Sequence, residues 1–170
     1  VKAHPQGEMI FKNGKTEVSG FYRDPETGIR CKIRPDFLGN DYFLITDFKT
    51  ARSSDAKLFG TQAFGSSRLD LRIWMYAYGV SQIQRCPMPQ HLFFMVCEKV
   101  WPFESAVYYM TEEQRIQAEY DYRRALARIK NAIDTNHWPQ RQSKMEPLYT
   151  PKFFIDNDVE QHEKEMEEND

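Results

Sequence analysis

The chain has 170 residues, enough for one domain with a hydrophobic core. Its 28% charged and 14% aromatic residues are typical of a globular protein, and no apolar run approaches the roughly 20 residues that a membrane span requires. No signal peptide is recognisable, and the three cysteines are scattered without a C-x-x-C pair, which argues against a zinc or iron–sulfur site and favours a reducing, cytoplasmic location.

The net charge of −2 hides two oppositely charged regions. Residues 156–170 contain eight acidic residues and one lysine, so residues 1–155 carry 22 basic and 17 acidic side chains, a net charge of +5. A basic body with an acidic tail is typical of a nucleic-acid-binding protein. We predict one domain over residues 1–155 and a disordered tail over residues 156–170, with binding of a partner or mimicry of DNA as the alternative role of the tail.

The first expected elements are two short strands. Residues 1–15 are polar, and residues 16–22 have the pattern of a strand. Residues 29–34 alternate between apolar and basic side chains, which predicts a strand with one cationic face. The basic residues are Arg30, Lys32 and Arg34. They are either a solvent-facing surface, where Glu17 on the neighbouring strand could pair with one of them, or contacts for phosphate groups.

Two acidic residues and a lysine follow these strands. Asp36 comes after Pro35, while Asp47 and Lys49 follow an apolar run at residues 42–45 that is typical of a central strand. Because side chains alternate along a strand, Asp47 and Lys49 share one face, and a hairpin between residues 29–34 and this strand would bring Asp36 beside them. The alternative is a Pro-Asp turn and a solvated strand face. Charges at the end of a buried strand need partners, which favours a divalent metal site like that of the P-D…(D/E)-x-K nucleases.

Helical patterns and further strands fill the rest of the chain. Residues 52–65 predict a loop or a broken helix. A helix is expected over Arg68–Tyr78, capped by Ser66 or Ser67 and ended by Gly79. Its aromatic residues are expected in the core rather than as platforms for stacking bases, and they are Trp74, Tyr76 and Tyr78. Strands are expected at residues 91–97 and 105–110.

The last expected element is a long helix. The sequence T-E-E-Q at residues 111–114 is a capping box, and the helix continues to about residue 136. Its predicted apolar stripe consists of Ile116, Tyr120, Leu126, Ile129 and Ile133. The order of the elements predicts an α/β domain with a mixed central sheet flanked by helices. The sequence contains neither a G-x-S-x-G elbow nor a phosphate-binding G-x-x-x-x-G-K-[ST] loop, and the four histidines lack the spacing of metal ligands.

These motifs resemble the nuclease domain of exonuclease VIII (RecE) and its phage and prophage relatives. That family is a branch of the PD-(D/E)XK group, which includes lambda exonuclease and the RecB nuclease domain. The matching segments are E-V-S-G-F-Y at 17–22, G-I-R-C-K-I-R-P-D at 28–36, I-T-D-F-K-T at 45–50, Tyr76 with Gly79, A-V-Y at 106–108, Y-R-R-A-L at 122–126 and Trp138-Pro139. The resemblance implies a restriction-endonuclease-like fold.

The resemblance also implies roles for particular residues. Asp36, Asp47 and the Phe48 carbonyl would bind Mg²⁺ or Mn²⁺, Glu17 would support a second metal, and Lys49 would orient or deprotonate the attacking water. The residues implied to contact DNA are Arg30, Lys32, Arg34, Arg72 and Tyr76. Members of the family digest one strand of a DNA duplex from its end inside the bacterial host. They leave a single-stranded tail for a strand-annealing partner, and they often work as ring-shaped homo-oligomers.

The sequence departs from the family pattern in two respects. Arg72 stands where the family usually has a glutamine, and the helices that usually precede the first strand are not present in this sequence. Both features favour the alternative that the chain is a catalytically inactive DNA-binding or assembly module with the nuclease fold. A Cas4-like protein would need four clustered cysteines, which the sequence lacks.

Overall fold

The structure is a computed structural model that describes residues 4–139, 144–145 and 147–149. The chain divides into two compact units, Val1–His137 and Trp138–Asp170, and every helix and strand of the described residues lies in the first unit. The predicted acidic tail at residues 156–170 lies outside the described residues.

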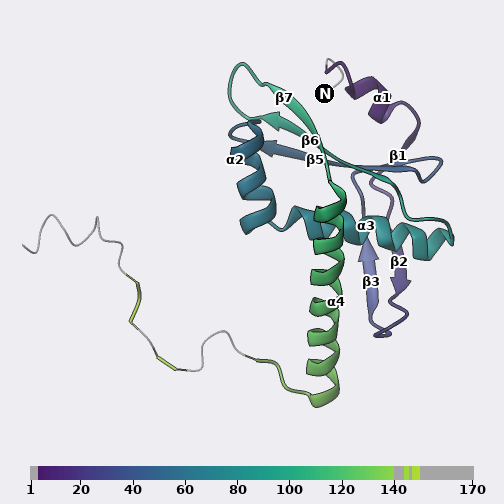
Figure 1. Ribbon diagram of the computed structural model, residues 1–170, viewed down its shortest axis with the longest axis vertical. Coiled ribbons are helices and arrows are strands. Elements are labelled where there is room, and N and C mark those ends of the chain that lie inside the picture. Colours follow the sequence, from purple (N-terminus) through teal and green to yellow (C-terminus); the bar gives the residue numbers. More distant parts are fainter. Residues whose placement is uncertain (1–3, 140–143, 146, 150–170) are drawn as a thin grey trace, which may run out of the picture. The chain divides into compact units, whose positions relative to one another are not determined.

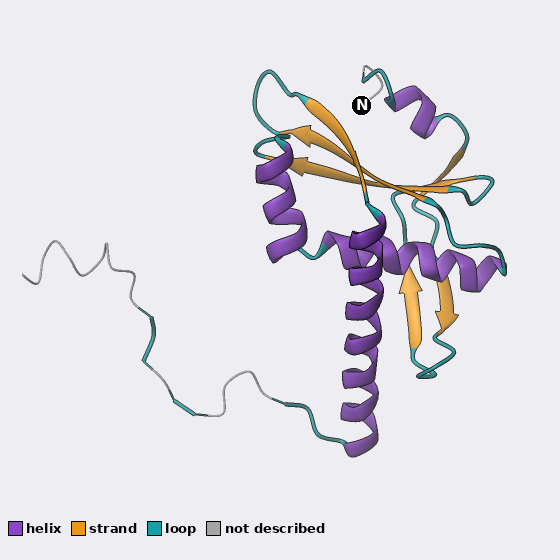
Figure 2. Cartoon of the chain, viewed as in Figure 1, coloured by secondary structure: helices purple, strands orange, loops and turns teal. Residues whose placement is uncertain are grey.

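A five-stranded mixed sheet forms the centre of the first unit (Figures 1 and 2). The strands follow the order β1-β4-β5-β6-β7. β5 pairs with β6 in parallel, whereas all the other pairs in this sheet are antiparallel. The bounds are Gly14–Thr16 for β1, Phe37–Gly39 for β4, Leu44–Ala51 for β5, His91–Glu98 for β6 and Ser105–Tyr109 for β7. The predicted α/β class with a mixed sheet is therefore confirmed.

Helices cover both faces of this sheet, with α2, α3 and α4 on one side and α1 on the other (Figure 2). The bounds are Gly7–Phe11 for α1, Ala56–Gly60 for α2, Thr61–Ser66 for the π-helix η1, Leu69–Gln84 for α3 and Glu112–Thr135 for α4. The broken helix predicted at residues 52–65 is confirmed as α2 followed by η1. None of the helices in the described ranges is both long and apolar enough to cross a membrane.

A separate two-stranded sheet corrects the predicted strand pairing. β2 (Gly20–Arg23) pairs with β3 (Arg30–Ile33), so the segment at residues 29–34 does not form a hairpin with the strand that carries Asp47. The partner of β5 on that side is the short strand β4, which the sequence analysis missed. The strand predicted at residues 16–22 is also interrupted, because Glu17 has a φ of +55° and separates β1 from β2.

The inner face of the β2–β3 hairpin is fixed to α4 by buried polar groups. The Tyr22 and Tyr122 hydroxyls are 2.9 Å apart. Asp24 is fully buried and accepts a hydrogen bond of 2.9 Å from the Arg123 guanidinium. Burial opposes ionisation of Asp24, but hydrogen bonds from Thr27 and the charge of Arg123 outweigh it and lower the pKa of Asp24 from its ordinary value. The hairpin is therefore held in a defined position.

Helix α3 is longer than predicted, because Gly79 lies inside it rather than at its end. A Cβ atom at position 79 would lie 2.8 Å from both Ile33 Cγ2 and Tyr22 Cε1, so only glycine lets the hairpin approach this closely. The predicted serine cap is also wrong, since the residue before α3 is Arg68, with a φ of 44° and no capping side chain. The Arg68 guanidinium instead binds Asp70 and, at 2.6 Å, Asp121 on α4.

We expect Gly79→Ala to destabilise the protein by about 1–3 kcal/mol, because the added methyl group overpacks the contact with Ile33 and Tyr22. This loss should exceed the ~1 kcal/mol that alanine gains over glycine in a helix. Urea unfolding followed by circular dichroism measures the difference. The matched control is Gly60→Ala in α2, where a Cβ would meet no atom within 4 Å. A Gly79→Ala variant as stable as the native protein would contradict this account of the packing.

The capping box of α4 is confirmed, but the predicted apolar stripe is wrong. The Thr111 amide donates to Gln114 Oε1 at 2.9 Å, and the Gln114 amide donates to the Thr111 hydroxyl. Four of the five stripe residues are exposed: Ile116, Tyr120, Ile129 and Ile133. The buried face is instead formed by Ala118, Asp121, Tyr122, Leu126 and Ala132. On this face Asp121 binds Arg68, and the Tyr122 hydroxyl contacts that of Tyr22.

Candidate active site

The short strand β4 brings Asp36 to the central strand β5. Phe37 pairs with Thr46 in the antiparallel register of these strands, so the same register extended by one residue sets Asp36 opposite Asp47. The Asp36 side chain confirms the placement, because its Oδ2 accepts a hydrogen bond of 2.7 Å from the Phe48 amide. The predicted convergence of the two aspartates is thus observed, although β4 rather than β3 produces it.

Lys49 connects the acidic residues of this cluster. Its Nζ lies 2.5 Å from Asp47 Oδ2 and 3.6 Å from Asp36 Oδ2, and it donates a hydrogen bond of 2.8 Å to the Phe48 carbonyl. Asp47 and Lys49 share one face of β5, as predicted from the alternation of side chains. We call Asp36, Asp47, the Phe48 carbonyl and Lys49 the carboxylate cluster.

Asp47 is the most deeply buried member of the carboxylate cluster, with 1% of its surface exposed. Burial raises the pKa of Asp47, and the hydrogen bond and charge of Lys49, with the charge of Arg72, offset this only in part. Its Oδ2 atom lies 2.5 Å from the Lys49 ammonium and 3.5 Å from the Arg72 guanidinium, so two cations share one buried carboxylate oxygen. A buried carboxylate with a raised pKa beside converging cations marks a candidate reactive site.

The donor atoms of the carboxylate cluster fit a hard divalent cation. Two carboxylates and a backbone carbonyl are the oxygen ligands that Mg²⁺ and Mn²⁺ prefer. Within the described ranges there is no group of three or more Asp, Glu, His or Cys side chains placed to hold a metal ion. A cation in this cluster would therefore take its remaining ligands from water and from a substrate phosphate, as Mg²⁺ commonly does.

Helix α3 adds two predicted residues to the edge of the cluster. The Arg72 guanidinium lies 3.5 Å from Asp47 Oδ2, and its side chain is 43% exposed. Tyr76 is half-buried one turn later on the same face. Burial raises the pKa of the Tyr76 hydroxyl, which also experiences the charges of Arg72, Asp47, Asp36 and Arg34. Arg72 and Tyr76 therefore belong to the same site as the carboxylates.

Glu17 lies at the rim of the site rather than inside it. Its backbone amide donates to the Asp36 carbonyl at 3.2 Å, and its carboxylate lies 2.8 Å from Arg34 Nε. The predicted pairing of Glu17 with a cation of the neighbouring strand is therefore confirmed. Arg30 and Lys32 are exposed on the outer face of β3, farther along the hairpin.

Two further residues on that outer face of the hairpin, Phe21 and Arg23, were not predicted as site residues from the sequence. Phe21 pairs with Lys32, and Arg23 pairs with Arg30. Strand alternation could have placed both side chains outward, but the register that sets them beside the basic residues of β3 depends on where the hairpin turns.

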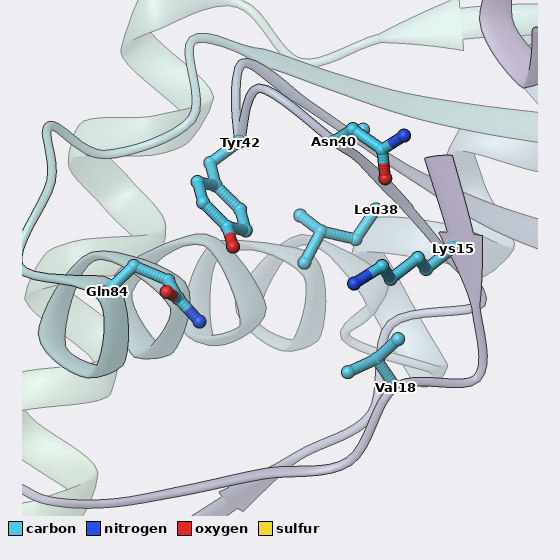
Figure 3. Close-up of a pocket in the computed structure, with 7 residues that line it drawn as sticks. Lys15, Val18, Leu38, Asn40, Tyr42 and Gln84 are labelled. Atoms are coloured by element: carbon cyan, nitrogen blue, oxygen red, sulfur yellow. The ribbon is translucent and has the colours of Figure 1, made fainter. Parts of the chain in front are cut away.

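A separate hollow of about 110 Å³ lies beside β1, β4 and the end of α3. Figure 3 shows its polar groups around the apolar side chains of Val18 and Leu38. Its lining residues are Lys15, Val18, Leu38, Gly39, Asn40, Tyr42 and Gln84. None of them belongs to the carboxylate cluster. Perturbed pKa values and converging charges mark a reactive site better than a hollow alone, so we assign the candidate active site to the cluster.

Comparisons with known proteins support the fold. A candidate exonuclease from Eubacterium rectale has a similar structure, with a TM-score of 0.57 and 16% identity over 89% of this chain and 60% of that chain. At this identity the likeness shows the fold alone, and the chain spans 60% of that protein's length. The protein SSO0001 matches with a TM-score of 0.40 and 16% identity over 68% of this chain and 51% of that chain, too low to carry an argument.

No curated protein matches the sequence. Residues 1–150, however, match a family model described as a PDDEXK-like domain of unknown function. The chain carries the letters of the P-D…(D/E)-x-K pattern at Pro35-Asp36 and Asp47-Phe48-Lys49. The chain therefore belongs to the family of PDDEXK-like domains designated DUF3799.

Proposed function

We propose that the chain is a metal-dependent exonuclease that hydrolyses phosphodiester bonds from the ends of duplex DNA. The observation that carries this proposal is the convergence of the buried Asp47 carboxylate, the Asp36 carboxylate and the Phe48 carbonyl on the Lys49 ammonium, at 2.5, 3.6 and 2.8 Å. A buried carboxylate remains costly even when it is ion-paired. It is useful where a cation and a substrate phosphate complete the site.

Each member of the carboxylate cluster has a role in this proposal. Asp36, Asp47 and the Phe48 carbonyl would hold Mg²⁺, or Mn²⁺ in its place. Such a cation lowers the pKa of bound water and neutralises charge on the leaving oxygen. Lys49 would orient the attacking water and stabilise the negative charge that develops on the phosphorus oxygens. Glu17 would support a second metal after leaving Arg34.

The substrate would be a duplex DNA end, and one strand would remain as a single-stranded tail. Arg72 reaches the cluster with a partly exposed guanidinium, so it would contact the phosphate next to the bond that breaks. Arg30, Lys32, Arg34 and Tyr76 would hold the DNA without reading its sequence. By the RecE-type motifs, a strand-annealing protein in the bacterial cytoplasm would take up the tail, and the chain would assemble into a homo-oligomeric ring.

A second candidate function is a non-catalytic DNA-binding or assembly module. The observation that favours it is the pair of cations on one carboxylate, because Lys49 at 2.5 Å and Arg72 at 3.5 Å both neutralise Asp47. In that case the cluster would be a closed set of ion pairs, and Arg72 would occupy the family's glutamine position to keep the metal out.

Digestion of end-labelled linear duplex DNA decides between the two functions. The native protein, Asp47→Ala and the control Glu119→Ala are each assayed with Mg²⁺, with Mn²⁺ and with EDTA. Glu119→Ala changes an exposed acidic residue of α4. We expect metal-dependent release of nucleotides from the native and Glu119→Ala proteins and none from Asp47→Ala. DNA binding without cleavage in either metal would overturn the exonuclease and support the assembly module.

A further inference from the structure

The outer face of the β2–β3 hairpin combines an aromatic ring with three cations. The register sets Phe21 opposite Lys32 and Arg23 opposite Arg30, and all four side chains are exposed. The residues that alternate with them, including Tyr22 and Cys31, are buried on the inner face. The outer face therefore has a strong positive charge around a ring that is 71% exposed.

The acidic residues near this hairpin do not neutralise its outer face. Asp24 and Glu26 at the turn bind Arg123 of α4, at 2.9 Å and 3.2 Å. Among the described residues, Arg30 and Lys32 form no ion pair, and Lys32 Nζ lies 5.7 Å from the centre of the Phe21 ring. Arg23 donates a hydrogen bond of 2.7 Å to the Gly28 carbonyl. These charges thus remain available to a polyanion.

The chain leads from this face directly to the candidate active site. β3 runs from Arg30 to Ile33 and leads through Arg34 and Pro35 to Asp36. At ~3.3 Å per residue, the extended chain covers roughly 13 Å between Arg30 and Arg34. The Tyr22–Tyr122 and Asp24–Arg123 contacts hold the hairpin from behind, so the outer face is preformed and little ordering is needed when a ligand binds.

We infer that this face binds a single DNA strand, with Phe21 stacked on a base and with Arg23, Arg30 and Lys32 on phosphates. Duplex DNA keeps its bases paired and stacked inside, so cations alone would suffice for contacts to its backbone. An exposed ring among cations is instead the arrangement that binds unpaired bases. The inference rests on the proposed nuclease function and adds to it a path for one strand next to the cluster.

Binding of a fluorescent oligo(dT) strand, measured by anisotropy in EDTA so that no cleavage occurs, tests this inference. We expect Phe21→Ala to weaken oligo(dT) binding about tenfold or more and to change the binding of a blunt duplex little. Phe21→Tyr, which keeps an aromatic ring, should restore the affinity. Lys32→Gln should weaken binding and reduce the slope of log affinity against log salt by about 0.7.

The matched control is Tyr120→Ala, because Tyr120 is also an exposed ring, 60% exposed on α4, with the Arg124 guanidinium 5.5 Å from its centre. This variant should bind oligo(dT) like the native protein. Unchanged oligo(dT) affinity in Phe21→Ala would overturn the inference. An equal loss of affinity for single-stranded and duplex DNA in Phe21→Ala would also overturn it. A change of oligomeric state in Phe21→Ala, with no change in DNA affinity, would overturn it as well.

A small chromogenic phosphodiester, bis(4-nitrophenyl) phosphate with Mn²⁺, separates this inference from the proposed function. Such a substrate reaches the carboxylate cluster but is too short to reach Phe21, so Phe21→Ala should hydrolyse it at the native rate. If Phe21→Ala hydrolyses this substrate and binds oligo(dT) like the native protein, the proposed nuclease function stands and the inferred strand path is wrong. If Phe21→Ala loses oligo(dT) binding and no variant hydrolyses the substrate, the strand path is supported and the proposed nuclease function is wrong.

Discussion

Asp47→Asn should abolish metal-dependent DNA cleavage and at the same time stabilise the fold at neutral pH. Asparagine has nearly the same shape, but it lacks the charge that would bind the cation. The loss of several kcal/mol of charge stabilisation corresponds to a decrease in rate of about a thousandfold or more. The gain in stability follows from burial, because Asp47 is 1% exposed and its ionised form has lost most of its hydration.

The pH dependence of this stabilisation has a definite sign. Burial raises the pKa of Asp47 in the folded protein, so the folded state binds the proton more tightly than the unfolded state does. Asp47 therefore contributes its full stabilisation of the fold below the ordinary pKa of an aspartate. This contribution is lost as the pH rises through the raised pKa of the folded state. Asparagine does not titrate, so the advantage of Asp47→Asn in thermal melting should grow from pH 4 to pH 7.

Asp36→Asn is the control that separates catalysis from stability. Asp36 is more exposed than Asp47, with 32% of its side chain accessible, and an asparagine oxygen could still accept the Phe48 amide hydrogen bond. We expect Asp36→Asn to lose cleavage with a smaller gain in melting temperature at pH 7 than Asp47→Asn, because the Asp36 carboxylate keeps more of its hydration. Cleavage at the native rate by Asp47→Asn would remove Asp47 from the reaction. A difference in melting temperature between the native and Asp47→Asn proteins that stays constant from pH 4 to pH 7 would contradict the effect of burial.

Sequence patterns predicted the parts of this site that depend on local geometry. Strand alternation placed Asp47 and Lys49 on one face, and the apolar run before them indicated a central strand. The capping box of α4 depends only on neighbouring residues, and it is present as predicted. The family resemblance placed Arg72 near the reaction, and the structure puts it 3.5 Å from Asp47.

The sequence could not predict the parts that depend on tertiary contacts. β4 has three residues, too few to show a period, and its pairing with β5 is decided by the whole sheet. Gly79 resembles a helix end, but the close approach of Ile33 and Tyr22 explains it instead. On α4, isoleucine and tyrosine residues at helical spacing suggested a buried stripe. The buried face instead includes Asp121 and Tyr122, and hydrophobic periodicity does not report their polar contacts with Arg68 and the hairpin.

Lys49→Ala should lower DNA cleavage by about 100- to 10,000-fold, the usual range for removing a group that assists proton transfer. Metal binding should persist or become tighter. In the structure the ammonium contacts Asp47 Oδ2 and the Phe48 carbonyl and lies 3.6 Å from Asp36 Oδ2, and these are the oxygens that would ligate a cation. Lys49 therefore has to move when a metal binds, and alanine removes this competition.

Isothermal titration with Mn²⁺ and cleavage of labelled duplex DNA measure the two effects on the same protein. The matched control is Lys57→Ala, which removes an exposed lysine of α2 and should change neither. Cleavage at the native rate by Lys49→Ala would exclude Lys49 from the chemical step. If Lys49→Ala instead loses Mn²⁺ binding together with cleavage, the ammonium helps to hold the oxygens in place, and the ion pairs of the cluster are structural rather than poised for a metal.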